Sequence, residues 1–388
     1  MAVYGQVDKR IEKSVAVLLK PVSGLCDMNC AYCFYRDETQ KREKDYFGKM
    51  SRETLKNVVR KTMLNARGYV SYLYQGGEPT LAGLDFFKAA AEYQKKYQRN
   101  NLLVYNALQT NGYGIIHDRT NSAEEWCEFF REENFLIGLS VDGTKEFHDK
   151  YRCDTLGRGT YDRVMETAKL FDRHGVDYNI LTVVTKDLAA GIEKVYEDYR
   201  RRGWKYQQYI LCLDPLGEIG KGEYSLTPEQ YGEFLVKLFG LWYRDYRKGR
   251  QPYIREFSNY ISILRGYPPE NCAMCGTCSV QNVVEANGNV YPCDFYALDP
   301  YCLGNYNRDK YAQIQSHPAA GEFVSRSRKL PKECKSCVFF PLCRGGCFRN
   351  RVRQAGTEEY ENRYCAGCRR FFQECLGSLK DIARDKNF

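Results

Sequence analysis

The chain has 388 residues, of which 43% are hydrophobic, and it carries a formal charge of +9 and 18 cysteines. This length predicts two or three domains with a sizeable core. No apolar run is long enough to cross a membrane, and residues 1–13 are polar and charged, so the sequence excludes a membrane span or signal peptide and predicts a cytoplasmic protein.

Short apolar runs alternate with helical patterns between residues 14 and 213. We predict strands at 14–20, 69–75, 103–109, 135–141, 178–185 and 206–213. Helices are predicted at 51–66, 84–98, 122–132, 160–174 and 191–202, with Ser51 and Ser122 as N-caps. Repeated strand-then-helix units predict an α/β fold in which a parallel sheet with right-handed crossovers curls into a partial barrel.

Glycine-rich or polar segments follow the ends of these strands. They are GGEP at 76–79, TNG at 110–112, DG at 142–143 and DPLG at 214–217. In parallel α/β architectures ligands bind at the carboxyl ends of the strands. A cysteine-rich stretch follows the first strand, so we expect all these segments to face one cavity.

The pattern changes after about residue 220. An aromatic helical stretch covers 229–248, and a cysteine-rich region with little strand periodicity follows from Cys272 to Cys375. We therefore predict a barrel at 1–220, a helical connector at 221–271 and a cysteine-rich domain at 272–388 that ends in a helix. We expect metal rather than a large core to hold this last part, because thiols in the cytoplasm stay reduced.

The stretch CDMNCAYCFY places Cys26, Cys30 and Cys33 at the spacing C-x3-C-x2-C. A zinc site with a fourth ligand from elsewhere is one interpretation, but none of the four histidines is near in sequence. Three thiolates suit a four-iron cluster whose fourth iron stays open for a ligand that is not part of the protein.

This loop resembles that of the radical S-adenosylmethionine (SAM) superfamily, in which a C-x3-C-x-aromatic-C loop follows the first strand of a partial (β/α)6 barrel. The resemblance implies that the amino and carboxylate groups of SAM chelate the open iron, with Tyr32 on the adenine. It also implies SAM contacts from Gly76, Gly77, Glu78, Ser140, Arg152 and Leu213. From the residues alone, a packed aromatic is the less favoured alternative for Tyr32, whereas Ser140 is equally a strand-end cap and Arg152 equally a surface charge.

A second group of cysteines has the spacing C-x5-C-x9-G-x4-C, then C-x2-C-x5-C-x3-C and a final Cys365. Two structural zinc sites would also use eight cysteines. The pattern resembles the SPASM domain, a two-cluster extension of radical SAM enzymes that modify peptides. The resemblance implies one auxiliary cluster on Cys272, Cys278, Cys293 and Cys347 and another on Cys334, Cys337, Cys343 and Cys365.

Spacing alone does not distinguish this pairing from a local four-cysteine site at 334–347. The additional Cys275 is a competing ligand. For the other cysteines the default interpretation is a small buried hydrophobe; they are Cys127, Cys153, Cys212, Cys302, Cys368 and Cys375. The expected cofactors are three [4Fe–4S] clusters and SAM. Their negative charge would offset part of the +9.

Several motifs in order resemble anaerobic sulfatase-maturating enzymes over nearly the whole chain: YQGGEPTLAG, LQTNG, GLSVDG, CLDPL, YPCDFY and CRGGC. The resemblance implies that a 5′-deoxyadenosyl radical removes a Cβ hydrogen from a cysteine or serine in an unfolded sulfatase segment with a C-x-P-x-R motif, giving formylglycine. Asp294 would be the general base, although a turn or capping aspartate is the alternative. Tyr35 and Gln75 would position the target.

The implied partners are an unfolded sulfatase or peptide substrate and a ferredoxin or flavodoxin electron donor, with no nucleic acid and no membrane. A radical SAM/SPASM maturase that forms thioether or carbon–carbon crosslinks is the alternative; such enzymes often carry a leader-binding domain, and only 25 residues precede Cys26. A zinc-stabilised interaction module is a second alternative. Nucleic-acid modification ranks last, because the aromatic residues are scattered rather than gathered in a basic stripe.

Overall fold

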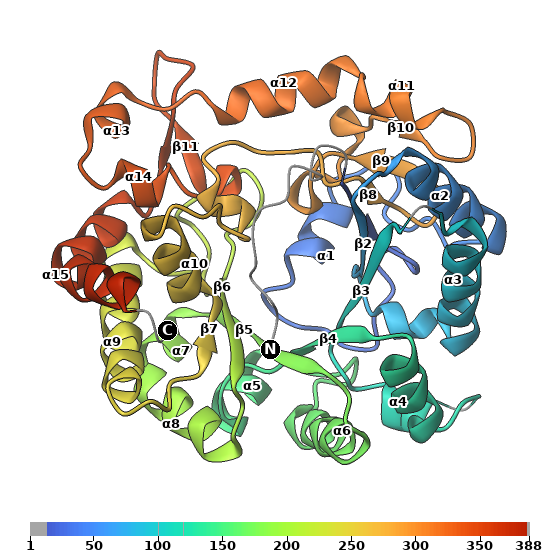
Figure 1. Cartoon of the computed structure of the whole chain (residues 1–388), viewed down its shortest axis with the longest axis horizontal. Helices are drawn as coiled ribbons and strands as arrows, with labels where there is room; N and C mark the ends of the chain where they lie inside the picture. The colour runs from blue at the N-terminus through green and yellow to red at the C-terminus, as the bar shows by residue number, and fades with distance from the viewer. Residues whose placement is uncertain (1–13, 100, 119, 386–388) are drawn as a thin grey trace.

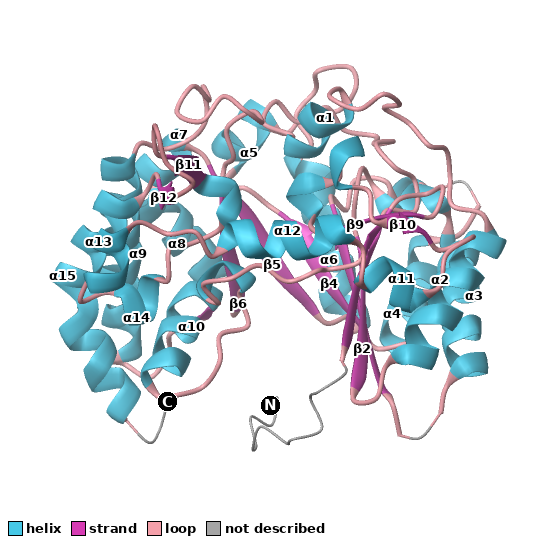
Figure 2. Ribbon diagram, turned by 90° about the horizontal axis from the view of Figure 1, so that it is seen from above, coloured by secondary structure: helices cyan, strands magenta, loops and turns pink. Residues whose placement is uncertain are grey.

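The computed structural model describes residues 14–99, 101–118 and 120–385. Six parallel strands pair in the order in which they occur in the chain. They curl into an open arch, the partial (β/α)6 barrel that the sequence predicts (Figures 1 and 2). The predicted strands are confirmed as β1 Val15–Leu19, β2 Tyr69–Tyr74, β3 Leu103–Thr110, β4 Phe135–Ser140, β5 Tyr178–Val184 and β6 Tyr206–Leu211.

Helices cover the outer face of this arch (Figure 2). The five predicted helices are confirmed as α2 Arg52–Asn65, α3 Leu84–Tyr97, α4 Ala123–Glu132, α6 Tyr161–His174 and α8 Ile192–Arg202. The Ser51 hydroxyl accepts the amide hydrogen of Thr54, and Ser122 forms a capping box with Glu125. These caps satisfy amide groups that the first turn of a helix leaves free.

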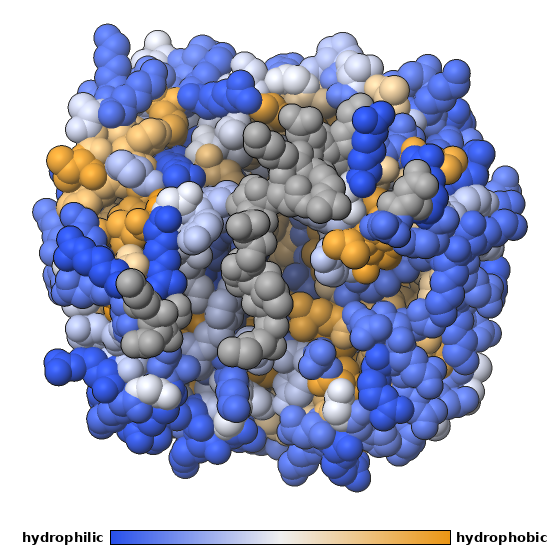
Figure 3. Space-filling view, in the orientation of Figure 1, coloured by the Kyte–Doolittle hydropathy of each residue, from blue (hydrophilic) through white to orange (hydrophobic). Residues whose placement is uncertain are grey.

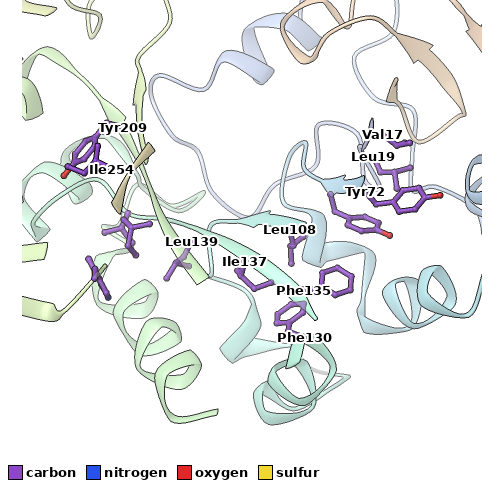
Figure 4. Packing of buried hydrophobic residues seen from close by; sticks show 14 of the residues in the cluster. Val17, Leu19, Tyr72, Leu108, Phe130, Phe135, Ile137, Leu139, Tyr209 and Ile254 are labelled. Carbon is purple, nitrogen blue, oxygen red and sulfur yellow. The ribbon is translucent and has the colours of Figure 1, made fainter. Parts of the chain in front are cut away.

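The two faces of the sheet differ in burial. Val70, Tyr72 and Tyr74 of β2 are buried against the helices, whereas the alternate side chains Ser71 and Leu73 point to the inner face of the arch and stay partly exposed. The core between sheet and helices includes Leu108, Phe130, Phe135, Ile137 and Leu139 (Figure 4). Burying each of these side chains contributes about 1.5–3 kcal/mol, so the outer face holds the barrel together.

Short elements interrupt the loops at the carboxyl ends of the strands. They are α1 Phe34–Thr39 after the three-cysteine loop, the 3₁₀ turn Pro79–Ala82 that begins at the proline of GGEP, α5 Lys145–Tyr151 after DG, and α7 Lys186–Ala190 after β5. The sequence did not predict them because segments of four to seven residues are too short to show a helical period. They shape the loops in which the predicted site residues lie.

A second helical layer follows the barrel. Helix α9, Pro228–Tyr246, confirms the aromatic stretch predicted at 229–248, and it packs against the C-terminal helix α15, Cys365–Arg384. Strand β7 Tyr253–Ile254 pairs with β6 and leads into α10 Arg255–Leu264. Phe239, Phe257 and Phe371 pack their rings together between α9, α10 and α15. The expectation that metal rather than a core holds the cysteine-rich part is therefore incomplete, since α15 shares the main apolar core.

The cysteine-rich region also continues the barrel sheet. Strand β8 Val283–Val284 runs parallel to β1, where the amide of Lys20 donates to the Val284 carbonyl at 2.9 Å. Strands β9 Asn289–Tyr291 and β10 Gly304–Asn305 add to it in antiparallel fashion, so one ten-stranded sheet runs β10-β9-β8-β1-β2-β3-β4-β5-β6-β7. The predicted domain limits at 220/221 and 271/272 stay a prediction.

The rest of this region is built from short pieces: α11 Tyr311–Gln315, α12 Pro318–Ser327, α13 Lys332–Ser336, α14 Phe340–Cys343 and the two-stranded ribbon of β11 Arg351–Arg353 and β12 Tyr360–Asn362. Among the helices of the described residues, none has both the length and the apolar character needed to cross a bilayer.

The packing of α9 on α15 predicts a sharp difference between two glycines of α15. A Cβ on Gly367 would lie 2.2 Å from the Pro228 carbonyl oxygen, whereas a Cβ on Gly377 would meet nothing within 4 Å. Gly367→Ala should destabilise the anaerobically prepared holoprotein by on the order of 1–3 kcal/mol through overpacking. Gly377→Ala, the matched control, should be neutral or stabilising by up to about 1 kcal/mol. Equal denaturation midpoints for the two variants would contradict this packing.

Candidate active site

The three predicted cluster cysteines lie in the loop between β1 and α1, and a second loop holds this loop in place. The Asn29 amide donates to the Cys153 carbonyl at 2.7 Å, and the Ala31 amide donates to the Tyr151 carbonyl at 2.9 Å. Met28 and Asp154 form an isolated antiparallel bridge. The segment after α5 therefore fixes the backbone around Cys30, while Cys33 begins α1.

The chemistry of this loop fits a metal cluster. Burial raises the pKa of Cys26 well above its usual value and raises that of Cys30 to about 11, and the neighbouring thiols oppose each other's ionisation. Bound metal reverses this balance, because a coordinating thiol is deprotonated. Within the described residues, no three His, Cys, Asp or Glu side chains gather closely enough to hold one ion. Three thiols in one buried loop are the donor set that an iron–sulfur cluster uses.

Gly76 and Gly77 carry the chain past the start of the cysteine loop. The Gly77 amide donates to the Ser23 carbonyl at 2.9 Å, and the Glu78 amide donates to the Leu25 carbonyl at 2.8 Å. A Cβ on Gly77 would lie 2.0 Å from the Leu25 oxygen, and Gly76 has φ +131°. Only glycine permits this approach, which explains why GGEP follows β2.

The Glu78 carboxylate ties two loops together. Its Oε1 accepts hydrogen bonds from Thr80 and from the Thr110 hydroxyl, and its Oε2 accepts the Asn111 amide at 2.8 Å. Burial, followed by the charge of Asp27, raises the pKa of Glu78 to about 7. Glu78 thus holds the TNG segment against GGEP through protein donors.

Tyr32 and Arg152 meet Asp142 behind the cysteine loop. The Tyr32 hydroxyl donates to Asp142 Oδ2, the Arg152 Nη1 donates to the Tyr32 hydroxyl at 2.9 Å, and Arg152 and Asp142 lie 3.8 Å apart. The Val183 amide holds Asp142 Oδ1 at 2.8 Å. Arg152 is buried in this network and is no surface charge. Ser140 and Leu213 lie half-buried at the carboxyl ends of β4 and β6.

The eight SPASM cysteines fall into two spatial groups. The ionisation of Cys293 is opposed by Cys347 and Cys272, and that of Cys347 by Cys272 and Cys278. The ionisation of Cys334 is opposed by Cys365, Cys343 and Cys337. These are the two sets that the SPASM resemblance implies. The assignment of these cysteines to two clusters, rather than to a local site at 334–347, stays a prediction.

Two other cysteines lie beside these groups. Cys275 is exposed, and its thiol faces the Asn271 carbonyl at 3.7 Å. Cys368 is buried one helical turn after Cys365 and contacts Cys343. Cys127, Cys212 and Cys375 are buried, as expected for small apolar side chains, whereas Cys153 and Cys302 are partly exposed.

Asp294 faces the carboxyl ends of β1 and β2. Its Oδ1 lies 2.5 Å from the Lys20 ammonium, and its Oδ2 accepts a hydrogen bond from Gln75 Nε2 at 2.9 Å. The Lys20 side chain is 0% exposed and that of Asp294 is 13% exposed. Lys20, the residue after β1, was not among the predicted site residues. The cysteine-rich region thus presents a carboxylate to the barrel, where a buried cation holds it.

The Tyr35 ring packs against the Lys20 ammonium. The Lys20 ammonium lies 3.5 Å from the centre of the Tyr35 ring, a cation–π contact. The Tyr35 hydroxyl donates to Glu285, which also accepts a hydrogen bond from Arg42 at 2.8 Å. Tyr35 is thus buried with its hydroxyl on Glu285 and its ring against Lys20.

Glu38 is a further buried carboxyl of this region, and neither of its oxygens has a hydrogen-bond partner in the described residues. Burial and the charge of Asp294 raise its pKa to about 8, whereas Lys20, Arg42 and Arg349 act in the opposite direction. Glu38 is therefore mostly protonated near neutral pH. Asp294 is then the carboxylate that balances the positive charge of Lys20.

A cavity of about 620 Å³ extends along the inner face of the arch, lined among others by Leu73, Gln109, Asn179, Tyr206 and Gln208. Figure 3 shows apolar residues exposed toward the middle of the corresponding face of the molecule, inside a mostly hydrophilic rim. Leu73 and Gln75 lie two residues apart in β2 and its extension, so both point to this inner face. None of the predicted site residues lines this cavity. Lining residues such as Asn134, Tyr178 and Tyr206 lie at the amino ends of β4, β5 and β6, whereas Gln75 and Asp294 lie at the carboxyl ends of the strands.

Two protein-family models match the chain. The radical SAM superfamily model covers residues 21–199, and an iron-sulfur cluster-binding (SPASM) domain model covers residues 272–338. A cysteine-type anaerobic sulfatase-maturating enzyme from Clostridium novyi (strain NT) is 39% identical over 373 residues, which is 96% of this chain and 98% of that protein. The chain belongs to the anaerobic sulfatase-maturating enzymes.

The chain is also similar to a second type of sulfatase-maturating enzyme and to a solved structure. A serine-type anaerobic sulfatase-maturating enzyme from Bacteroides thetaiotaomicron is 32% identical over 380 residues, or 93% of this chain and 89% of that protein. A solved structure of native anSMEcpe with bound AdoMet and Kp18Cys peptide superposes with a TM-score of 0.88 at 40% identity, covering 95% of this chain and 99% of that one.

Membership of the anaerobic sulfatase-maturating enzymes settles the cofactor class. Radical SAM and SPASM domains imply [4Fe–4S] clusters and SAM, as the sequence predicts. Sequence reasoning missed Lys20, Asp142 and Glu285. The signal for Lys20 was a lone charge at the end of the apolar run SVAVLL; the signal for Asp142 was the carboxylate of the DG turn. Glu285 carried no local signal, because its partners lie more than 200 residues away.

The close approach of Gly77 to the Leu25 carbonyl predicts the effect of replacing this glycine by alanine. Gly77→Ala would push the new methyl into the Leu25 carbonyl and displace the backbone before Cys26. SAM affinity, measured by anaerobic equilibrium dialysis, should fall at least tenfold, or about 1.4 kcal/mol. Gly240→Ala in α9, where a Cβ meets nothing within 4 Å, is the control and should bind SAM as the wild type does. Unchanged affinity in Gly77→Ala would show that this segment does not shape the SAM site.

Proposed function

We propose that this protein oxidises a cysteine of an unfolded sulfatase-type chain to formylglycine. The main support is the position of Asp294. It contacts Lys20 and Gln75 at the carboxyl ends of the barrel strands, where the proposed SAM site also lies. In the reaction the side chain loses a hydrogen atom from Cβ, the proton of its thiol and one further electron. The radical derived from bound SAM would take the hydrogen atom, Asp294 the proton and an auxiliary cluster the electron. Water then replaces the sulfur, which leaves as hydrogen sulfide. Serine would give the same aldehyde directly.

We further propose which residues hold the cofactors. Cys26, Cys30 and Cys33 hold the cluster that binds SAM, and two sets of four hold the auxiliary clusters: Cys272, Cys278, Cys293 and Cys347, then Cys334, Cys337, Cys343 and Cys365. The mutual opposition of these thiols to ionisation supports both sets. When bound, the clusters and SAM supply one-electron oxidation at a C–H bond.

The SAM pocket is proposed to use the backbone of Gly76 and Gly77 and the side chains that surround the cysteine loop. Glu78 holds the loops after β2 and β3 together through its protein donors. Arg152, from the segment that pairs with residues 28–31, and Tyr32, from the cysteine loop, close the pocket. Ser140 and Leu213 lie at strand ends, where a ligand of a parallel sheet binds.

Asp294 is proposed as the general base that takes the thiol proton. Gln75 donates a hydrogen bond to one oxygen and Lys20 forms an ion pair with the other, and a carboxylate offers about four acceptor sites, so room for a proton remains. Fixing both oxygens orients the carboxylate before the substrate arrives, which lowers the entropic cost of proton transfer. Gln75 also faces the target, and Tyr35 acts through its contact with Lys20.

The carboxyl ends of the strands, where Gln75 and Asp294 lie, are the proposed binding place of the substrate peptide. Peptide binding is supported by the related structure that holds a Kp18Cys peptide. The cysteine preference is supported by the higher identity to the cysteine-type relative, 39%, than to the serine-type relative, 32%.

The remaining partners are proposed on general grounds. A ferredoxin or flavodoxin suits the role of electron donor, because these proteins are small and anionic and the chain has a formal charge of +9. A cytoplasmic location suits a protein whose 18 cysteines must stay reduced.

The decisive experiment incubates the anaerobic holoenzyme with SAM, a reductant and a peptide that carries the C-x-P-x-R motif. We expect conversion of the cysteine to formylglycine by mass spectrometry. Asp294→Asn should lower the formylglycine yield by on the order of 10²–10⁴-fold while 5′-deoxyadenosine still forms, because only the base is lost. Asp299→Asn, five residues on, where Oδ2 accepts the Glu43 amide, is the control and should stay active. A crosslinked peptide, or an unchanged one, would reject the proposed function.

The buried ion pair predicts a separate effect of Lys20. Lys20→Met should leave SAM cleavage intact but reduce formylglycine per 5′-deoxyadenosine by on the order of 10²-fold, because Asp294 loses its fixed orientation. Lys61→Met is the matched control, since Lys61 also joins the barrel to the cysteine-rich region, through the Tyr306 and Asp309 carbonyls. A product ratio in Lys20→Met equal to that of the control would show that Lys20 does not position Asp294.

A further inference from the structure

Arg351, the first residue of β11, is a buried cation in the cysteine-rich region. It is 5% exposed. Its Nε donates to the Gly345 carbonyl at 2.9 Å, its Nη1 to the Ser327 carbonyl at 2.6 Å and its Nη2 to the Gly346 carbonyl at 2.7 Å. Three carbonyls on one guanidinium fix both its position and its plane.

These carbonyls place Arg351 between the two proposed cluster sites. Gly345 and Gly346 are the link between Cys343, of the second set, and Cys347, of the first set. Ser327 accepts the Cys278 amide on its hydroxyl at 2.9 Å, which ties the third carbonyl to the first set as well. A Cβ on Gly345 would lie 3.2 Å from Arg351 Nη2, so the glycine leaves room for the guanidinium.

Arg351 has no carboxylate as a counter-ion in the described part of the chain. Its hydrogen-bond partners are neutral carbonyls, and no ion pair joins it to an Asp or Glu there. Burial lowers its pKa, whereas the charges of Cys278, Cys347, Cys334 and Cys343 favour its charged form. Because an isolated buried charge is costly, a buried cation needs an anion nearby, and these thiolates are the anions that face it.

We propose that Arg351 is a positioning residue for electron uptake, whose fixed charge stabilises the reduced state of both auxiliary clusters. This rests on the cluster ligands of the proposed function. Taking up one electron makes a cluster more negative by one charge, so a cation held between the two sites favours reduced over oxidised. Net charge and hydrogen bonding around a cluster are known determinants of its potential. Arg351 therefore serves both sites at once.

The test is a redox titration of the holoenzyme followed by electron paramagnetic resonance, with Arg351→Gln against wild type. At the wild-type midpoint potential, the ratio of reduced to oxidised auxiliary cluster should fall at least tenfold in the variant, a shift of about 59 mV for one electron. Arg353→Gln is the matched control: Arg353 lies on the same strand, but it is exposed and contacts Thr357 and Glu358. It should titrate as the wild type does.

Arg351→Lys keeps the positive charge but removes the guanidinium and its three-carbonyl hydrogen bonding. It should keep the ratio within about threefold of wild type, because the charge remains. If Arg351→Gln loses its auxiliary iron while Arg351→Lys keeps it with a wild-type potential, the charge requirement is supported. An unchanged potential in Arg351→Gln would overturn the proposal, and so would equal shifts or equal loss of iron in both variants. Because no substrate is needed, these outcomes are independent of whether the wild type makes formylglycine.

Discussion

The pairing of β8 with β1 is the contact on which the site depends. It joins residues more than 260 positions apart in the chain and makes the cysteine-rich region a continuation of the barrel sheet. Lys20, which pairs with Val284 through its amide, is also the residue whose side chain meets Asp294. The same few residues thus set the register between the two regions and hold the carboxylate. A register slip of one residue would turn the Lys20 side chain away from the inner face.

Buried charges recur where the two regions meet. Lys20 with Asp294 and Arg42 with Glu285 are ion pairs whose cations are fully buried. Removing such charges from water costs several kcal/mol per ion, and hydrophobic residues of similar size are often at least as stable in such places. These pairs are therefore weak contributors to stability but strong determinants of geometry. Tyr35 lies between them, with its ring on Lys20 and its hydroxyl on Glu285, so that one network joins Asp294 to the start of α1.

The sequence predicts the barrel well, because each strand and long helix carries its own periodic pattern. The strands of the cysteine-rich region were not predicted: β8 and β10 have two residues each, too few for any alternation to show. The same limit applies to the site. Cysteine spacing and GGEP are local signals, whereas the Lys20–Asp294 contact and the place of Arg351 arise only when distant loops fold against each other. Pairing of the SPASM cysteines needed the family resemblance, since spacing alone allowed a local site.

The ten-stranded sheet ends in β7 on one side and β10 on the other, and each of these outer strands has only two residues. A long free edge offers a row of unpaired amides and carbonyls on which another chain can form a strand. An enzyme that binds peptide segments would otherwise risk pairing its substrate with its own sheet. Because the edge strands are so short, the arch can stay open to a polypeptide and still offer it few backbone groups with which to pair.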